Sequence, residues 1–134
     1  MSGRAVRGRA LEAAARAVRR RAYAPYSRFR VGAAVAAGGR IHFGCNVENA
    51  SYGLTLCAER SAAAAAVAAG ARRIEAVAVA SGTSPPTPPC GMCLQTLAEL
   101  AGPGLPVVLL GARGGRVETT LGELLPRAFG RKFL

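Results

Sequence analysis

The sequence predicts an α/β protein with a three-layer α/β/α fold, built on a mixed sheet of about five strands. Alanine-rich helical segments alternate along the chain with short apolar segments of strand length. One pair, Gly38-Gly39, separates two such segments and is typical of a tight hairpin turn. The hairpin must be antiparallel, whereas strands joined through helices are expected to be parallel, with right-handed crossovers.

A helix is expected at the start of the chain, over residues 3–21. Leu11, Ala15 and Val18 share one face of this helix, and the arginines fall mostly on the other face. Pro25 closes the segment because proline cannot continue a helix. The chain then favours two hairpin strands and a loop of mixed polarity, at residues 30–37, 40–45 and 46–56.

The strongest helix signal lies at residues 57–70. Alanine, the residue with the highest helix propensity, makes up most of this segment, and Gly70 suits its C-terminal cap. The remaining elements are expected in this order: a strand at 73–80, a proline-rich loop at 81–89, a helix at 91–101, strands at 107–110 and 116–119, a short helix at 121–125 and a tail at 130–134.

Length and composition exclude several classes of protein. The 134 residues fit one domain, 1–134, with a core of its own. A hydrophobic content of 51% with only 19% charged residues excludes an extended disordered chain. The net charge of +11 points to anionic partners such as nucleic acid, lipid or acidic substrates, but we expect the arginines of the first helix to form a solvated face.

The N-terminus lacks the apolar stretch of a signal peptide. No apolar run approaches the roughly 20 residues of a membrane span. We therefore expect a cytoplasmic protein with reduced thiols and no membrane partner. In that compartment a Cys-x-x-Cys pair is more typical of metal binding or catalysis than of a disulfide.

Three of the four cysteines lie in two short motifs at predicted helix starts. Cys57 opens one helix, and Cys90 and Cys93 open the next within a Pro-Cys-x-x-Cys pattern. The partial positive charge at a helix N-terminus lowers the pKa of a thiol and favours the thiolate, which binds zinc. Three protein ligands leave the fourth tetrahedral position open, as in catalytic sites. The sequence therefore predicts a catalytic Zn²⁺ held by these cysteines.

Two charged residues next to Cys57 suit chemistry at such a site. Glu59 can reach water at the zinc without taking a coordination position, and a carboxylate at that place moves protons. Arg60 is expected to donate hydrogen bonds to the thiolate sulfurs, because three thiolates around one Zn²⁺ leave a net negative charge. Zinc deaminases share this pattern of a His or Cys ligand, an x-Glu and a Pro-Cys-x-x-Cys.

Other interpretations of the Cys-x-x-Cys pair remain open at this point. The pair alone also fits a structural zinc knuckle or a redox couple. A structural zinc site needs a fourth ligand, for which Cys45 is available. Cys45 has no partner at ligand spacing, so we expect it to behave as a small buried hydrophobe.

With these motifs placed, the chain resembles the cytidine deaminase family, in its small homotetrameric branch with an all-cysteine zinc site. The resemblance rests on five segments in register: residues 23–34 (YAPYSRFRVGAA), 44–52 (GCNVENASY), 57–60 (CAER), 89–93 (PCGMC) and 124–129 (LLPRAF). It implies a cytidine-deaminase-like fold, a zinc site of the three cysteines, and Glu59 as the proton shuttle.

The resemblance also implies residues that bind a nucleoside. Asn46 and Glu48 are expected to hold the ribose hydroxyls, Phe29 to stack on the pyrimidine and Ala58 to offer backbone groups to the base. Tyr52 and Phe129 resemble positions that reach the site of a neighbouring subunit.

Apart from the resemblance, these residues also fit plainer roles. Asn46 and Glu48 suit a turn stabiliser and a solvated carboxylate. Ordinary packing suits Tyr52 and Phe129, and periodicity alone places Phe29 in the core.

The implied activity is hydrolysis of the C4 amino group of cytidine or deoxycytidine, giving uridine or deoxyuridine and ammonia, as in pyrimidine salvage. Leu94 departs from the family pattern, which has arginine there, and keeps a modified or antibiotic cytosine nucleoside open as the substrate. A basic nucleic-acid-binding protein with a structural zinc is the alternative from another class. That alternative leaves Glu59 and the Asn46/Glu48 pair without a purpose, so nucleic acid is not the expected partner.

Overall fold

The computed structural model describes residues 3–134, with side chains from Gly8 onward. Met1 and Ser2 lie outside this range. They belong to the N-terminal segment for which no signal peptide was expected. The helices and strands are α1 (Gly3–Arg19), β1 (Gly32–Ala37), β2 (Arg40–Cys45), α2 (Ala58–Ala68), β3 (Ala76–Ala80), α3 (Gly91–Leu100), β4 (Pro106–Leu110), β5 (Arg116–Thr120) and α4 (Leu121–Leu124). None of the helices in the described range combines the length and apolar character needed to cross a bilayer.

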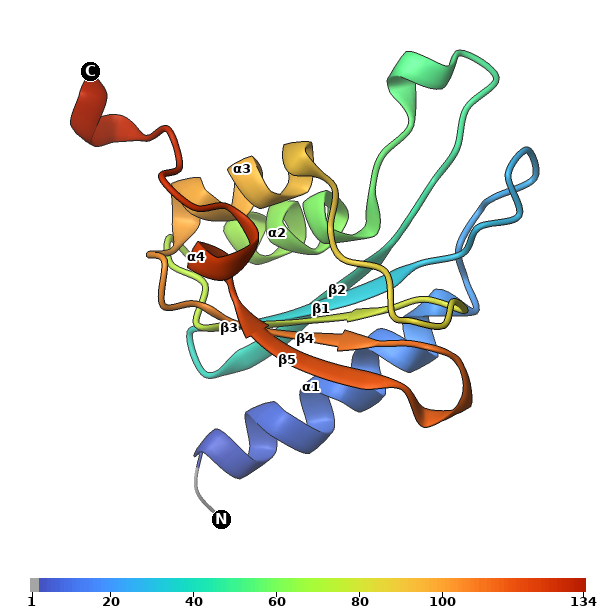
Figure 1. Cartoon of the computed structure of the whole chain (residues 1–134), viewed down its shortest axis with the longest axis horizontal. Coiled ribbons are helices and arrows are strands. Elements are labelled where there is room, and N and C mark those ends of the chain that lie inside the picture. The colour runs from blue at the N-terminus through green and yellow to red at the C-terminus, as the bar shows by residue number, and fades with distance from the viewer. Residues whose placement is uncertain (1–2) are drawn as a thin grey trace.

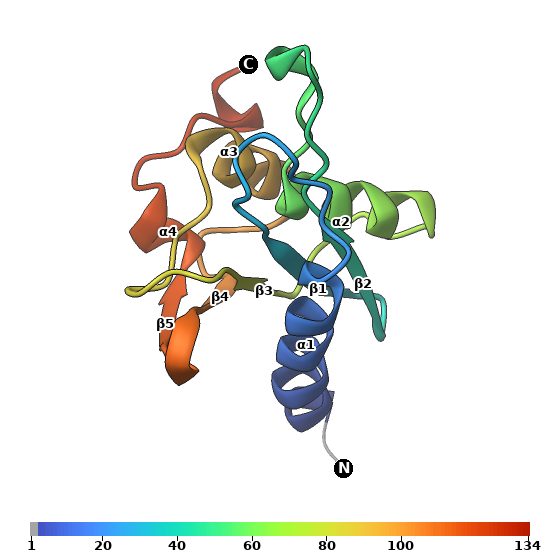
Figure 2. The ribbon, with the colours of Figure 1, turned by 90° about the vertical axis from the view of Figure 1, so that its right-hand side faces the viewer.

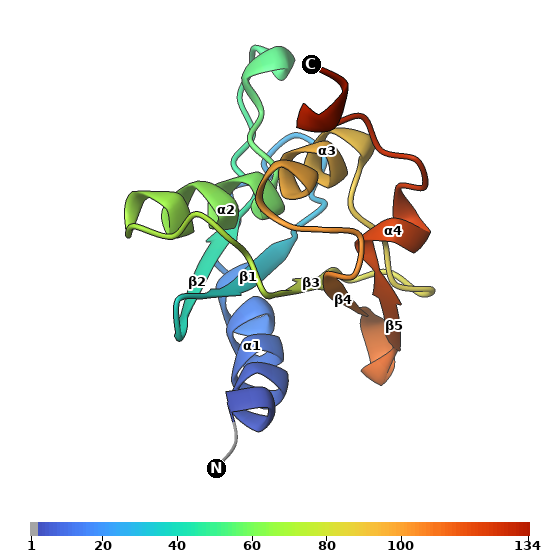
Figure 3. The ribbon, with the colours of Figure 1, turned by 90° about the vertical axis from the view of Figure 1, so that its left-hand side faces the viewer.

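The strands form one mixed sheet in the order β2-β1-β3-β4-β5. Strand β1 runs antiparallel to both β2 and β3, so β2 and β3 are parallel to each other. Strand β4 is parallel to β3, and β5 returns antiparallel to β4. Helix α1 covers one face of the sheet, and α2, α3 and α4 lie on the other (Figures 1, 2 and 3). The predicted three-layer fold with a mixed five-stranded sheet is confirmed.

Strand β1, which lies between β2 and β3, is buried along its whole length and consists of small residues. Its side chains alternate between the two faces of the sheet. Ala33 and Val35 belong to the core beneath α2 and α3, whereas Ala34 and Ala36 pack toward α1 with Leu11. Small side chains on both faces let helices approach the sheet closely from either side.

The Gly38-Gly39 turn between β1 and β2 has φ values of +61° and +75°. Both values lie in the left-handed region that glycine adopts without strain, so this turn follows the prediction.

Strand β1 begins at Gly32 and not at residue 30, as the sequence suggested. The backbone N–H of Val31 donates to the Asn46 side chain and not to a neighbouring strand. Strand β3 similarly begins at Ala76 and not at residue 73, because the N–H of Ile74 donates to the carbonyl of Leu100 outside the ladder. Side-chain and loop contacts thus take over the backbone groups that would extend these strands.

Helix α1 crosses β1 at Gly32, where close contact leaves no room for a side chain. A Cβ at this position would overlap the carbonyl oxygen of Ala15 and lie 2.6 Å from the backbone N of Arg19. We expect Gly32→Ala to lower the free energy of unfolding by about 2 kcal/mol or more, since the helix must shift away from the sheet. Urea denaturation measures the change.

The matched control is Gly8→Ala, at an exposed position of α1 where an added Cβ meets no atom within 4 Å. Alanine has a higher helix propensity than glycine, so this variant should be unchanged or up to about 1 kcal/mol more stable. Equal effects of the two substitutions would contradict the described packing.

Candidate active site

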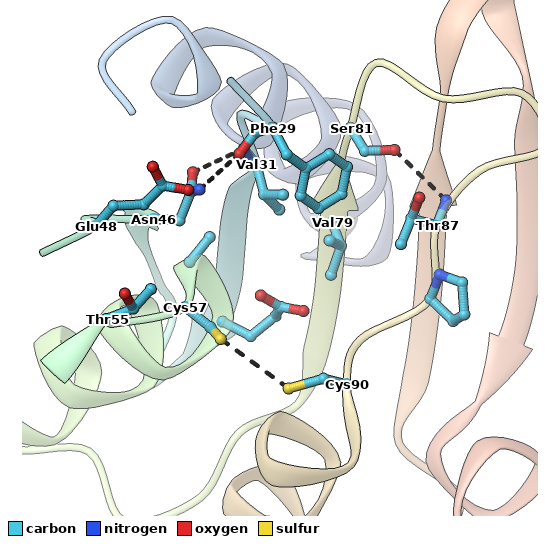
Figure 4. Close-up of a pocket in the computed structure, with 13 residues that line it drawn as sticks. Phe29, Val31, Asn46, Glu48, Thr55, Cys57, Val79, Ser81, Thr87 and Cys90 are labelled. Carbon is cyan, nitrogen blue, oxygen red and sulfur yellow. Dashed lines mark hydrogen bonds between the residues drawn. The ribbon is translucent and has the colours of Figure 1, made fainter. Parts of the chain in front are cut away.

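A cavity of about 260 Å³ opens beside the first turns of α2 and α3 (Figure 4). Strands β2 and β3 are parallel, so the loops that lead from them to α2 and α3 leave the sheet at the same edge. The cavity is lined by Phe29, Val31, Asn46, Glu48, Thr55, Cys57, Ala58, Glu59, Val79, Ser81, Thr87, Pro88 and Cys90.

Three thiols meet at the floor of this site. Cys57 and Cys90 are the N-terminal capping residues of α2 and α3, and Cys93 lies in the first turn of α3. The Sγ of Cys90 lies 4.0 Å from that of Cys57 and 3.5 Å from that of Cys93. Figure 4 shows the Cys57 and Cys90 sulfurs facing each other across the gap between the helices.

The spacing of the sulfurs suits a zinc ion. Zn–S bonds of about 2.3 Å at tetrahedral angles place the sulfurs about 3.8 Å apart. All three Sγ atoms lie within 4.8 Å of one another. Among the described residues the metal-binding group contains these three thiols, which leaves the fourth position of a tetrahedron for a non-protein ligand. Cys45 lies half-buried in β2, outside this group, and not in the buried environment expected for it.

The pKa values of two of the thiols depart from the ordinary cysteine value in opposite directions. Burial raises the pKa of Cys93 far above its ordinary value, and the nearby negative charge of Glu59 adds to this effect. Burial also raises the pKa of Cys90, but hydrogen bonds, foremost that from the backbone N–H of Cys93, outweigh it, and the net shift is downward. Three adjacent thiolates repel one another unless a positive charge lies between them, so the donor set fits Zn²⁺.

Arg60 lies beside the thiols, where the sequence placed it. Its Nη2 donates to the carbonyl oxygen of Thr55 at 2.9 Å and to the Sγ of Cys57 at 3.8 Å. The hydrogen bond to Cys57 raises the pKa of the guanidinium above its usual value. Its Nε is buried and has no hydrogen-bond partner among the described residues. A buried, charged donor next to these sulfurs fits a cluster that carries negative charge when metallated.

Glu59 lies in the first turn of α2 and is only 5% exposed. Burial raises the pKa of its carboxyl above the ordinary glutamate value, because the charged form loses its hydration. Ala58, just before it, is fully buried and also lines the cavity. A carboxyl with raised proton affinity therefore lies next to the thiols and faces the same space.

Asn46 connects the cavity wall to the loop before β1. Its Nδ2 donates to the carbonyl of Phe29 at 2.7 Å, and its Oδ1 accepts from the N–H of Val31 at 2.8 Å. The Phe29 ring is 40% exposed and borders the cavity (Figure 4), so it does not take the core position that periodicity favoured. The amide of Asn46 keeps one free N–H and one free lone pair.

Glu48 is held by the turn at residues 26–27. One carboxylate oxygen accepts from the backbone N–H groups of Tyr26 and Ser27, at 2.9 and 3.2 Å, and the other accepts from the Ser27 hydroxyl. The Ser27 hydrogen bond holds the pKa of Glu48 below its ordinary value. Glu48 therefore enters the cavity as an anion with a fixed orientation. The sequence reasoning did not assign a role to Ser27, although it belongs to the quoted 23–34 segment.

Tyr52 and Phe129 do not line the cavity of their own chain. Tyr52 is 74% exposed on the loop after β2 and meets Tyr26 edge-on, with ring centroids 6.0 Å apart. Phe129 is 60% exposed and stacks on Phe133 at 5.9 Å. Both rings therefore present apolar surface away from this site.

The sequence reasoning missed one wall of the cavity, formed by the end of β3 and the proline-rich loop. Val79, Ser81, Thr87 and Pro88 lie there. The Ser81 and Thr87 hydroxyls each bond to that of Thr83, at 3.1 and 2.6 Å. Their position in the chain could have indicated these residues, because the proline-rich loop leads directly into the Pro89-Cys90 motif.

Leu94, the departure from the family pattern, is a core residue. Its side chain is 6% exposed and packs in the cluster beneath α2 and α3. The next residue, Gln95, points outward and donates to the carbonyl of Phe129 at 2.9 Å. Leucine at position 94 thus contributes to the core and does not line the cavity.

Known proteins are similar to this chain in sequence and in fold. The family described as the cytidine and deoxycytidylate deaminase zinc-binding region matches residues 7–108. The cytidine deaminase of Sporosarcina psychrophila is 46% identical over 92% of both chains, and that of Halalkalibacterium halodurans is 50% identical over 81% of this chain and 83% of its own. The crystal structure of the Burkholderia pseudomallei cytidine deaminase has a TM-score of 0.86 at 52% identity, covering 90% of this chain and 98% of its own.

Removing any one of the three clustered thiols should weaken zinc binding. We expect the unaltered chain to bind about one Zn²⁺, and Cys57→Ser, Cys90→Ser and Cys93→Ser each to lower the affinity by tenfold or more, on the order seen when a site loses part of its shell. Competition with a chromogenic chelator measures this affinity.

Cys45→Ser is the control, since Cys45 lies outside the group. It should bind zinc like the unaltered chain. A comparable loss of affinity in Cys45→Ser would indicate a four-thiol site and contradict the open position.

Proposed function

The chain belongs to the zinc-binding cytidine and deoxycytidylate deaminase family, and from this we propose that it hydrolyses cytidine and deoxycytidine. Water adds at C4, the C4–N bond breaks, and uridine or deoxyuridine and ammonia are the products. The observation that carries the proposal is the presence of three thiols and a buried carboxyl in one cavity, with a nucleoside-sized space between them and an asparagine–glutamate pair. This reaction belongs to pyrimidine salvage.

Cys57, Cys90 and Cys93 would hold the zinc. When bound, Zn²⁺ supplies Lewis acidity that makes water a nucleophile near neutral pH. The N-termini of α2 and α3 point toward the same place, where their partial positive charge would stabilise the negative charge of a zinc–thiolate cluster. Arg60 draws negative charge from the Cys57 sulfur, which keeps an all-thiolate shell from donating too strongly.

Glu59 is the group that moves protons. Its carboxylate accepts a proton from the attacking water and passes it to N3 of the pyrimidine. It then takes the proton of the hydroxyl added at C4 and delivers it to the amino group, so the C4–N bond breaks, ammonia leaves and the C4 carbonyl forms. Burial raises the pKa of Glu59 and so brings its proton affinity closer to those of the attacking water and the pyrimidine nitrogens. A carboxyl with such a pKa can both accept and donate a proton during the reaction.

The upper part of the cavity suits a nucleoside. Asn46 retains one donor and one acceptor, and Glu48 is a fixed anionic acceptor, so together they match ribose hydroxyls, which both donate and accept. Phe29 offers a ring face to the pyrimidine, and the backbone at Ala58 offers polar groups to its edge. Contacts to both the ribose and the pyrimidine of the nucleoside would hold its C4 over the thiol cluster.

The other two candidate functions receive less support. A structural zinc in a nucleic-acid-binding protein needs four ligands, and the described residues bring three thiols together. The case for a modified cytosine nucleoside rested on Leu94, whose side chain lies in the core and outside the cavity wall. The nucleic-acid alternative also leaves Glu59, next to the thiols, without a purpose.

We further propose that residues 1–134 act as one domain and assemble as a homotetramer with shared active sites. The exposed rings of Tyr52 and Phe129 support this assembly, because each presents apolar surface outside its own cavity. A neighbouring copy would bring such a ring to the cavity mouth, exclude water and complete the substrate site. The single chain would then lack part of its own site.

Glu59→Gln tests the proton-shuttle role. The amide keeps the size of the side chain but cannot take up a proton, so kcat for cytidine should fall by at least about 100-fold. Zinc content should stay at the level of the unaltered chain. The release of ammonia is the measurement of turnover.

Glu118→Gln, at an exposed carboxylate of β5, serves as the control and should keep full activity. Near-normal turnover in zinc-loaded Glu59→Gln would exclude this glutamate as the shuttle.

Mixing two inactive variants tests the shared site. Tyr52→Ala should lose activity because its neighbours lack the ring, and Glu59→Gln because its own site lacks the carboxyl. Mixed oligomers contain sites with Glu59 from one chain and Tyr52 from another, so activity should return after subunit exchange.

The control mixes Cys57→Ser with Glu59→Gln. Cys57 and Glu59 of any one site come from the same chain, so subunit exchange cannot bring an intact Cys57 together with an intact Glu59. The mixture should therefore show no more activity than each variant shows alone. Recovery in the control mixture, or none in the first, would refute sites completed by a neighbour.

A further inference from the structure

Arg19, the last residue of α1, contacts two loops that each carry residues lining the cavity. Its Nε donates to the backbone carbonyl of Arg30 at 3.0 Å. Its guanidinium also covers Gly82, where an added Cβ would overlap Nη2 and lie 3.3 Å from Cζ. One planar group therefore contacts two loops that are 52 positions apart in the sequence numbering.

The two residues that Arg19 contacts are sequence neighbours of cavity residues. Arg30 is between Phe29 and Val31, which form the aromatic side of the cavity. Gly82 follows Ser81, which lines another part of the cavity with Thr87. Figure 4 shows Phe29 and Ser81 at the same end of the cavity, above the thiols.

The backbone of Arg19 is itself fixed. A Cβ at Gly32 would lie 2.6 Å from its N and 2.9 Å from its Cα, so the end of α1 rests directly on the start of β1. The side chain therefore extends from an immobile point toward Gly82. Within the described side chains no carboxylate pairs with Arg19, so the contacts use the shape and donors of the guanidinium.

We propose that Arg19 is a positioning residue that sets the distance between the Phe29–Val31 segment and the Ser81–Thr87 loop. Both segments line the cavity that would receive the pyrimidine ring, so the inference rests on the proposed nucleoside substrate. Asn46 and the Ser81–Thr83–Thr87 hydroxyl group hold each wall separately, and Arg19 connects one wall to the other. A lysine can replace it only in part, because an ammonium lacks the flat surface that lies over Gly82.

The first test compares Arg19→Ala, Arg19→Lys and the control Arg20→Ala, at the exposed neighbouring position. With cytidine as the substrate, Arg19→Ala should raise KM on the order of tenfold and change kcat much less, because binding geometry is lost and the proton shuttle is not. The KM of Arg19→Lys should lie between those of Arg19→Ala and the unaltered chain. The KM of Arg20→Ala should equal that of the unaltered chain. Zinc content should be equal in all four proteins.

Gly82→Ala approaches the same contact from the other side. Its Cβ displaces the guanidinium, so KM should rise in the chain that retains Arg19. In the Arg19→Ala background the same substitution meets no guanidinium and should have little further effect. If the fold-increases in KM of the two single variants multiply in the double variant, the two residues act independently, and the proposal is overturned.

Amide hydrogen exchange supplies a readout that does not depend on turnover. In zinc-loaded Arg19→Ala, exchange should quicken in residues 28–31 and 81–87 and stay unchanged in β4. If Arg19→Ala does not fold, Gly82→Ala gives the same comparison. Unchanged exchange in both segments would overturn the positioning role, whereas a zinc-loaded unaltered chain that leaves cytidine intact would overturn the proposed function instead.

Discussion

The site depends on one topological constraint, the parallel direction of β2 and β3. Parallel strands end at the same edge of a sheet, so the loops that follow them deliver α2 and α3 to the same place. The N-termini of both helices then meet, with their unpaired N–H groups and partial positive charge. Cys57 and Cys90 cap these two ends, and Glu59 follows within one turn. The thiol cluster, the carboxyl and the cavity all follow from that meeting.

Some of the arginines that make the chain basic have partners within its own structure. Arginine side chains donate to backbone carbonyl groups at three places, through Arg19, Arg60 and Arg72. Other arginines pair with glutamates on the surface. Arginine is suited to this use because its planar group donates several hydrogen bonds in fixed directions. A net charge of +11 is therefore weak evidence for a nucleic-acid partner.

Local signals predicted the order of elements, the Gly-Gly turn and the residues of the thiol cluster, because helix propensity, turn chemistry and ligand spacing are properties of short segments. Contacts between distant segments were not predictable in this way. Strand β1 begins at Gly32 because Asn46, far along the chain, takes up the N–H of Val31. Phe29 borders the cavity for the same reason, since Asn46 also holds its carbonyl. Leu94 could be assigned to the core only when the packing of α3 was known.

The central claim is that the thiol cluster and Glu59 form a zinc-dependent deaminase site. It is tested most directly by incubating the full-length, zinc-loaded protein with cytidine while following the absorbance of the base and the release of ammonia. We predict one ammonia for each cytidine lost, no reaction after a chelator removes the zinc, and recovery when zinc is restored. Cytidine that remains intact with the fully zinc-loaded protein would contradict the claim.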